Sequence, residues 1–454
     1  MPSINGTRHS NSGSYAGRFY VLLLLVFIAT IDFRLKLKDG GGTALLELTC
    51  FGFFGLLFLD AVALPKNVYA RLDRALQQNW MVCTYFVWAG LAALIGVSRS
   101  IDGIWTFRNV LPSFLIYLAV IYSIDRLDQF RTLFKVYAFG LAISLILGVF
   151  QRLLGGPYPN ALHEGVLAKM DLDGNIVSNL STGFFVHPNG FGIFLIPVTI
   201  FCVFALTRGY FRSAWQRMLL AGYLLLVLFN FWNTQTKGAW AWVAIGLALV
   251  YLPRIFDRMR FGISLSVMVG SIIGMVWFSM NSSAHGLRTL GSMQTRMELW
   301  RAGIKTIVSD QFVLWFGNGF QSMHNASVRM AELVYSNAHN NLINQVLYFG
   351  LPALALLLAL CLATLWRLAR LIEVAEGEQR TLTIILFASL IALFGEHFFE
   401  PVTDSVILQA QFFMLLGLAE AMVRMAPQNQ PARKPWENES YGVRRQAVSA
   451  GDLR

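Results

Sequence analysis

The chain has 454 residues, of which 56% are hydrophobic and 13% charged, and its mean hydropathy is +0.55. A soluble domain carries about 25% charged residues, so this composition excludes a water-soluble globular protein. The formal net charge of +11 does not indicate nucleic-acid binding, because the basic residues lie in short clusters between apolar stretches, as in the cytoplasmic loops of membrane proteins.

Apolar runs without interior charge clusters recur along the chain and are long enough to cross a bilayer if their ends extend into the polar flanks. Backbone amides find no hydrogen-bond partner in lipid, so each run is expected to be helical. The sequence therefore predicts an all-α integral membrane protein with about 12 transmembrane helices. The runs are 19–33, 43–64, 80–97, 104–124, 133–150, 184–206, 218–232, 239–252, 261–280, 342–366, 382–399 and 406–423.

Lys and Arg are distributed unevenly between the two sides of this predicted bundle. The N-terminus, the even-numbered connections and the C-terminal tail hold about twice as many of them as the odd-numbered connections, which places both termini in the cytoplasm. Arg34, Lys36 and Lys38, in the first outer connection, run against this rule. We predict a cytoplasmic tail over 1–18, a membrane domain over 19–425 with its first span retained, and a cytoplasmic tail over 426–454.

Two outer connections are long, 151–183 and 281–339, the latter between spans 9 and 10. A long extramembrane loop in a compact protein is usually functional. In the second loop, residues 295–308 have the apolar period of a helix, which predicts a helix lying at the membrane interface with its cations near lipid headgroups. The predicted apolar stripe is Met297, Trp300, Ile304 and Ile307, with Arg296, Arg301 and Lys305 at its flanks or opposite it.

His339 opens the tenth predicted span and follows a polar segment that begins at Tyr335. A polar cluster at the mouth of a span is costly in lipid unless it lines a cavity. A neutral imidazole beside cations serves as a general base near neutral pH. The alternative, a structural histidine that hydrogen-bonds the loop, is equally compatible with the sequence.

Several cations lie on the predicted outer face, where the charge rule disfavours them. A phosphate or pyrophosphate on a lipid carrier is a natural ligand for such a group. The alternatives are anchoring to lipid headgroups or pairing with Glu298, Glu332, Glu396 or Glu400. The cations are Lys237 in a short turn, Arg288, Arg296, Arg301 and Lys305 in the second loop, and Arg108 near the outer end of the fourth span.

Other polar groups gather at the same face. His187-Pro188-Asn189 has the pattern of a helix start, and capping is the favoured role. Glu396, His397, Glu400 and Asp404 cluster at the outer end of the last two spans, either to bind a sugar acceptor or to balance the cations. Neither a metal-ligand motif nor a nucleotide-binding motif is found, so no metal and no cofactor are predicted.

Together these motifs resemble those of the O-antigen ligases of Gram-negative bacteria, whose superfamily also holds O-antigen polymerases. His339-Asn340 followed by Gly350 is similar to the family signature, with Ala353 as a mild departure. Thr236-Lys237-Gly238-Ala239 is similar to an element in which the family has Arg in place of Lys. Thr295-Arg296 with Trp300, and His187-Pro188-Asn189, resemble two further elements.

The resemblance implies transfer of a polysaccharide from undecaprenyl pyrophosphate to the lipid A–core oligosaccharide at the periplasmic face of the inner membrane, with inversion and without metal or ATP. His339 would be the catalytic base. Lys237, Arg296, Arg288 and Arg301 would bind the pyrophosphate, with Arg108, His187, Asn340, Glu396 and Glu400 in support. An O-antigen polymerase is the nearest alternative, and a transporter or flippase of lipid-linked glycans is an alternative of a different class.

Overall fold

The computed structural model describes residues 12–31, 34–36, 42–63, 80–156, 168–170, 176–185, 187–208, 210–211, 213–252, 259–281, 291–319, 338–400, 402 and 405–426. This part of the chain is predominantly helical, with two short antiparallel hairpins, β1–β2 and β3–β4. Most of the two predicted tails, and the segment from 320 to 337, lie outside the described residues.

The helices and strands are spread along the whole described part of the chain. The first half comprises α1 (Ser12–Ala29), β1 (Arg34–Lys36), β2 (Gly42–Ala44), α2 (Leu45–Ala63), α4 (Trp80–Gly96), α5 (Asp102–Ser123), α6 (Leu127–Leu154), β3 (Ala168–Met170) and β4 (Ile176–Asn179). The second half comprises α7 (Pro188–Thr207), α8 (Ala214–Thr234), α9 (Lys237–Val250), α10 (Arg260–Asn281), α11 (Gly291–Ser309), α12 (Gln311–Phe316), α14 (Asn341–Val374), α15 (Gly377–Glu396) and α16 (Val406–Arg424).

Seven of the described helices, α5, α6, α7, α8, α14, α15 and α16, are long and apolar enough to cross a membrane. The chain is therefore an α-helical membrane protein, as its composition predicts. Each apolar run of the sequence coincides with a helix, but several of these helices are short, and a total of twelve spans stays a prediction.

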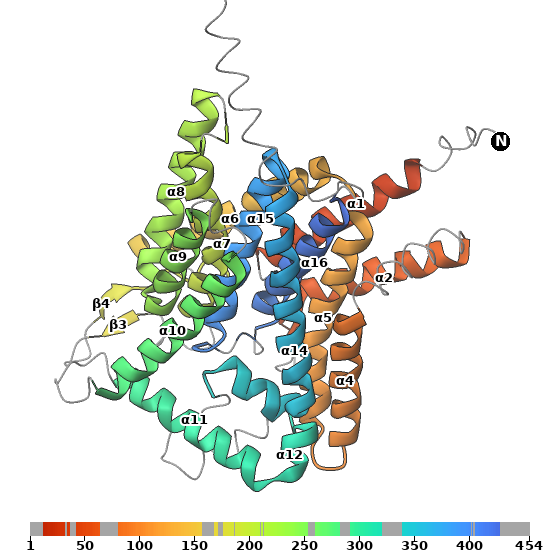
Figure 1. Ribbon diagram of the computed structural model, residues 1–454, viewed down its shortest axis with the longest axis vertical. Coiled ribbons are helices and arrows are strands. Elements are labelled where there is room, and N and C mark those ends of the chain that lie inside the picture. Colours follow the sequence, from red (N-terminus) through yellow and green to blue (C-terminus); the bar gives the residue numbers. More distant parts are fainter. Residues whose placement is uncertain are drawn as a thin grey trace, which may run out of the picture.

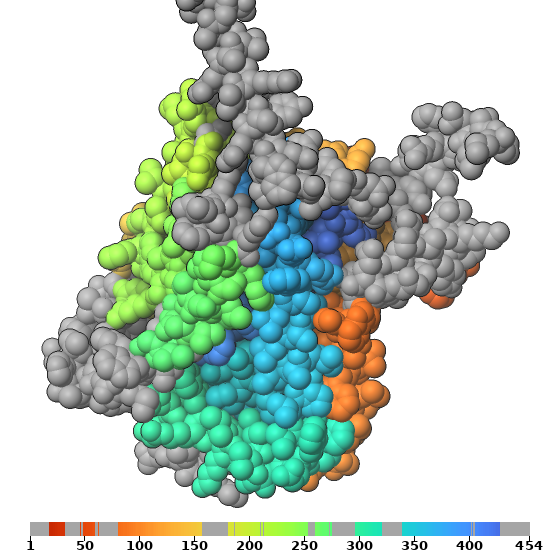
Figure 2. Space-filling view, viewed as in Figure 1, coloured from red at the N-terminus to blue at the C-terminus, as the bar shows by residue number. Residues whose placement is uncertain are grey.

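Most of the helices form an upright bundle, from which α1 and α2 project to the right in Figure 1, and α11 and α12 cross its lower end. α16 lies inside the bundle, almost fully buried, and packs most extensively against α5. In Figure 2 the teal atoms of α11 and α12 form the lower edge of the molecule. An ion pair of 2.6 Å joins Asp310, the N-cap of α12, to Arg99 beyond the end of α4, so this connection is fastened to the bundle.

Two predictions for the outer connections are corrected by the structure. The first connection begins later than residue 151, because α6 continues to Leu154, where Gly155 ends it in the left-handed region. The helix of the second loop is longer than 295–308, and its buried side includes only part of the predicted stripe, since Trp300 and Ile307 pack against the core. Ile304 is 51% exposed, whereas Leu299 and Ala302 are buried against the bundle.

The helix that follows the second loop, α14, is bent at Gly350, where φ is +82° and ψ is 170°. A side chain could not fit at this position, because a Cβ atom would lie 2.0 Å from the carbonyl oxygen of Trp315 in α12. Pro352 lies just beyond the bend and has no N–H for the preceding turn. The bend therefore lets α12 pack directly against the backbone of α14.

Carbonyl groups freed by this bend are served by other elements. A buried carbonyl without a donor is destabilising, so these bonds stabilise the bend and fasten residues 341–349 to α12 and α4. The first segment of α14 is thus held independently of the rest of the helix, and His339 and Asn340 lie at its N-terminus. Leu347 O accepts from Asn318 N (2.8 Å), Tyr348 O from Gly319 N (3.4 Å), and Phe349 O from Trp88 Nε1 (2.9 Å).

Candidate active site

Glu400, in the connection between α15 and α16, lies where several of the sequence motifs meet. Its side chain is only 7% exposed. Oε1 accepts hydrogen bonds from Asn189 Nδ2 at 2.9 Å and from Arg296 Nη2 at 2.5 Å, and Oε2 faces Nδ1 of His339 at 3.7 Å. These partners come from α7, from α11 and from the residue just before the N-cap of α14, so one carboxylate joins three distant parts of the chain.

The charge state of Glu400 follows from these neighbours. Burial disfavours the ionised form, but the contact with His339 and the positive charge of Arg296 outweigh it and hold the pKa of the carboxyl below its usual range. Glu400 is therefore a carboxylate at neutral pH. A fixed negative charge beside an imidazole orients the ring.

His339 occupies an unusual backbone conformation, with φ at +47°. Non-glycine residues rarely adopt this region, and strain of this kind is concentrated at functional sites. The next residue, Asn340, caps α14 by accepting hydrogen bonds from Leu342 N (2.9 Å) and Ile343 N (3.1 Å). The cap turns the chain sharply and leaves the His339 side chain 28% exposed while its Nδ1 faces Glu400.

Arg296 pairs with Glu400, which is one of the alternatives that the sequence leaves open for the outer cations. Its guanidinium bonds Glu400 and also donates from Nη1 to the carbonyl oxygen of Phe399 at 2.7 Å. The side chain is 21% exposed. Arg296 therefore fastens α11 to the end of α15 and neutralises Glu400, so it is not a free cation awaiting a phosphate.

The start of α7 confirms the predicted capping role of His187. Its Nδ1 accepts a hydrogen bond from Asn189 N at 3.1 Å, and Pro188 occupies the first helical position. Asn189, placed by this cap, bonds Glu400 through Nδ2 and lies 3.4 Å through Oδ1 from the hydroxyl of Thr236, which donates to it. The hydrogen-bond network of Glu400 thus extends to the residue that precedes Lys237.

Lys237 is the first residue of α9, and its side chain is exposed. Among the residues described, no carboxylate forms an ion pair with it. Gly238 is in contact with Glu396, since a Cβ atom at this position would lie 2.9 Å from both carboxylate oxygens. Glu396 is 1% exposed, and its Oε2 has no hydrogen-bond partner within the described part of the chain. The glycine after Lys237 therefore makes room for a buried carboxylate.

His397 has a structural position beside this cluster. It is 2% exposed, its ring packs on Phe412 at 4.6 Å between centroids, and its carbonyl accepts from Asn341 N at 2.7 Å. Burial lowers the pKa of His397 to about 3, so the ring stays neutral. His397 joins the end of α15 to the start of α14 and so supports the position of His339.

The remaining predicted site residues are spread more widely. Arg301 is exposed on α11, and the guanidinium of Arg108 lies 5.3 Å from the ring centre of Trp105 on its own helix. Arg288 and Asp404 lie outside the described residues. Three of the four cations expected to bind pyrophosphate are described by the structure, and of Lys237, Arg296 and Arg301 only Arg296 contacts the cluster that holds His339.

Comparison of the sequence with protein-family models and with curated proteins gives no match. The geometry of the cluster therefore carries the functional argument.

The central position of Glu400 is what the sequence did not reveal. Glu400 was expected among four acidic or imidazole side chains with two open roles, and its contacts show that it balances a cation. No local pattern marks it, since its partners Asn189, Arg296 and His339 are 211, 104 and 61 residues away. Its place shortly before Asp404 and the last span was the only available signal.

Proposed function

We propose that this membrane protein is a glycosyltransferase of the O-antigen ligase type, which moves a glycan from a polyprenyl pyrophosphate to the lipid A–core oligosaccharide. One observation supports the proposal most directly. The four motifs that carry the resemblance, at 187–189, 236–239, 295–300 and 339–350, converge on the carboxylates Glu400 and Glu396. Motifs that served only local structure would have no reason to meet.

In the proposed reaction, His339 accepts the proton of an acceptor hydroxyl while that oxygen attacks the anomeric carbon of the donor. The bond between the anomeric carbon and the pyrophosphate oxygen breaks, and the pyrophosphate leaves with the lipid. Glu400 faces Nδ1 of the imidazole and favours the tautomer with hydrogen on Nδ1, so Nε2 has the free lone pair that accepts the proton. The carboxylate then stabilises the imidazolium that forms. A single displacement inverts the anomeric centre.

The pyrophosphate is held by cations other than Arg296 in this proposal. Lys237 is exposed and begins α9, whose N-terminal N–H groups also favour an anion. Arg288 and Arg301 are the further candidates. Arg296 acts indirectly, by fixing Glu400, and supplies a phosphate contact only if the donor displaces part of its present hydrogen bonding.

Reconstitution with defined substrates tests this function. Purified protein in lipid nanodiscs would receive a polyprenyl-pyrophosphate glycan and lipid A–core acceptor in buffer with EDTA, and products would be separated by gel electrophoresis. We expect a glycan-bearing lipid A–core, formed by wild type and by an Arg370→Gln control, whose side chain is 64% exposed near the end of α14 remote from His339. The variant His339→Asn should form it at a rate lower by at least about 10²-fold.

Two alternatives give different products in the same assay. An O-antigen polymerase would lengthen the lipid-linked glycan and leave lipid A–core unmodified. A transporter would form no new bond, but the lipid-linked glycan would cross the membrane of proteoliposomes. The bend in α14 is a feature that transporters also use, yet the titratable groups near it gather at the helix end and not at the middle of the bundle.

A further inference from the structure

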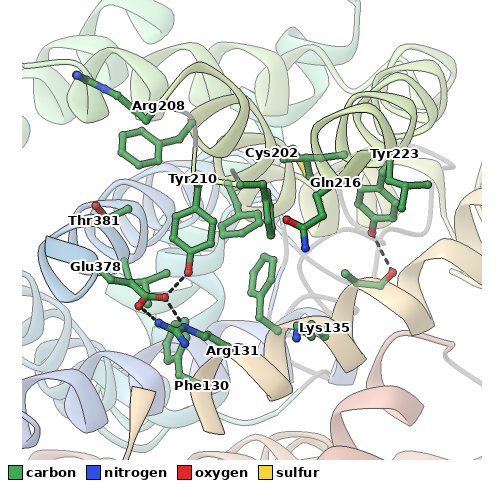
Figure 3. A pocket seen from close by; sticks show the side chains of 18 residues that line it. Phe130, Arg131, Lys135, Cys202, Arg208, Tyr210, Gln216, Tyr223, Glu378 and Thr381 are labelled. Carbon is green, nitrogen blue, oxygen red and sulfur yellow. Dashed lines mark hydrogen bonds and ion pairs between the residues drawn. The ribbon is translucent and has the colours of Figure 1, made fainter. Parts of the chain in front are cut away.

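A cavity of about 960 Å³ lies at the end of the bundle opposite Glu400 (Figure 3). Its lining includes Phe201 and Phe204 near the end of α7, and Glu378 and Leu382 near the start of α15. The active-site candidates lie at the other ends of these two helices, about 20 Å away at a rise of 1.5 Å per residue. The volume lies within the range of ligand-binding pockets.

Most of the cavity wall is apolar. Phe130 and Phe134 contribute from α6, Phe201 from α7, and Leu219 and Leu220 from α8. Leu219 is 56% exposed, so this wall continues to the outer surface of the helices, where lipid would lie. A hydrocarbon chain could enter from the bilayer without crossing a polar barrier.

On one side of the cavity, the carboxylate of Glu378 is already bonded by two neighbouring side chains. Arg131 Nε donates to Glu378 Oε1 at 2.5 Å, a second guanidinium nitrogen contacts the other carboxylate oxygen, and the hydroxyl of Tyr210 donates to the same carboxylate. Burial and the bond to Glu378 raise the pKa of Tyr210 to about 12, so it remains a neutral donor. Glu378 is thus fully engaged and cannot neutralise a further cation.

The lining of the cavity has a net positive charge, because it holds two further cations, Lys135 and Arg208, besides the Arg131–Glu378 pair. Lys135, one turn after Arg131, is exposed, and no carboxylate among the described residues pairs with it. Arg208 lies over the rings of Tyr251 and Phe204, at 5.5 Å and 6.0 Å from their centres. In Figure 3, Lys135 and the amide of Gln216 lie toward one side, and the Arg131–Glu378–Tyr210 group lies toward the other.

We propose that this cavity binds one anionic glycerophospholipid, with its phosphate at Lys135 and Gln216 and an acyl chain along the apolar wall. An unpaired cation beside an apolar wall that opens to lipid matches the two halves of such a molecule. Basic pockets between transmembrane helices at the cytoplasmic side bind anionic headgroups by the same physics. Sequence charge predicts that this end of the bundle is cytoplasmic. The site is separate from the proposed transfer reaction and does not depend on it.

Lipid titration of the delipidated protein, followed by native mass spectrometry, tests the proposal. We expect one equivalent of short-chain phosphatidylglycerol to bind at least fivefold more tightly than phosphatidylcholine of the same chain length. Lys135→Gln should remove this preference, and Lys135→Arg should keep it. Lys305→Gln, which removes a cation far from the cavity, should bind as the wild type does.

A cavity-filling variant, Leu220→Trp, separates the two halves of the site. It keeps every charge and should weaken phosphatidylglycerol by tenfold or more, because the acyl chain loses its place. Equal binding of both lipids by wild type would overturn the proposal, as would unchanged preference in Lys135→Gln. If sodium phosphate alone displaced the lipid at equal concentration, the cavity would be a simple anion site and the proposal would fail. Melting curves of each variant, compared with that of Lys135→Arg, show whether a loss of lipid binding comes from misfolding.

Discussion

Two buried glutamates of this protein each pair with an arginine, and the pairs are built differently. Glu420 of α16 is 3% exposed in its side chain, and the guanidinium of Arg367 in α14 reaches both of its oxygens, at 2.8 Å and 2.5 Å. Glu400 is 7% exposed, and Arg296 reaches only Oε1, which leaves Oε2 to face His339. In the first pair the arginine contacts both carboxylate oxygens. In the second pair the arginine contacts one oxygen, and the other faces the imidazole of His339.

This difference separates a pair that holds helices together from one that orients a reacting group. A bidentate arginine uses the whole carboxylate and fixes the spacing of α14 and α16. In Glu400, one oxygen accepts from both the amide of Asn189 and the guanidinium of Arg296. The other oxygen is therefore free to face His339, the proposed base. The comparison predicts that disturbing Glu420 affects stability alone, and that disturbing the Glu400 cluster affects transfer.

The largest effect is expected at His339. In the variant His339→Asn, the left-handed backbone is preserved, because asparagine tolerates positive φ, but the side chain cannot accept a proton. We expect transfer to fall by about 10²- to 10⁴-fold, the range for loss of a general base. The rate of glycan attachment in nanodiscs measures it, with the melting temperature unchanged as the control. Activity within threefold of wild type would remove His339 from the mechanism.

Disruption of the Arg367–Glu420 pair is expected to give the largest loss of stability. Arg367→Leu leaves Glu420 buried without its partner, which should cost about 3–5 kcal/mol of unfolding free energy. The double variant Arg367→Leu with Glu420→Leu should recover most of this loss, because no unpaired charge remains. Unfolding in mixed micelles measures both. Transfer per folded molecule should stay at the wild-type value, and a specific loss of transfer would abolish the distinction between the two pairs.

Glu400→Gln should have an intermediate effect on transfer, on the order of tenfold to a hundredfold, because the imidazole remains but loses its orienting charge. The matched control is the same substitution at the other buried glutamate, Glu420→Gln, which should lower stability without a comparable loss of transfer. An effect of Glu400→Gln confined to melting temperature would show that Glu400 is a structural partner of Arg296 and nothing more.

The pH dependence of stability gives an independent measurement at Glu400. Its pKa in the folded protein is lowered, because His339 and Arg296 outweigh the opposing effect of burial. The stabilisation is therefore fully present above the unfolded value of about 4.3 and is lost as the pH falls through the folded pKa. Melting of wild type against Glu400→Gln should show a constant difference at neutral pH that shrinks only in acid. A difference that shrinks between pH 8 and 6 would contradict this assignment.

The sequence predicts the helices of this fold well and their meeting points poorly. Apolar runs mark segments that avoid water, whether their side chains pack inside the bundle or face outward, and each of them lies on a helix. The bend at Gly350 could be anticipated only in part, since Pro352 marks a weak point but the carbonyl of Trp315 that excludes a side chain is 35 residues away. Tertiary contact, and not local pattern, decides such positions.

The candidate site divides in the same way. Capping by His187 is a local property and is confirmed. On α11, Trp300 and Ile307 of the predicted stripe pack against the core, but Ile304 is exposed, and Leu299 and Ala302, outside the stripe, are buried. For Arg296 the sequence leaves phosphate binding, headgroup anchoring and pairing with one of four glutamates open, and the structure shows pairing with Glu400. The sequence identifies the charged residues and a set of candidate partners, and only the tertiary contacts select one of them.

The smallest effect is expected at Lys237, the cation that most clearly differs from Arg296 and Arg367. Both arginines are engaged by a carboxylate, while no ion pair holds Lys237 in the described part of the chain. If its charge binds the donor pyrophosphate, Lys237→Gln should raise the KM for the donor by about threefold to tenfold, equivalent to about 0.7–1.4 kcal/mol, with little change in kcat. Lys237→Arg should restore it, since a guanidinium also pairs with phosphate. A fall in kcat at unchanged KM would place the charge in the transition state instead, and no effect at all would leave the pyrophosphate to Arg288 and Arg301.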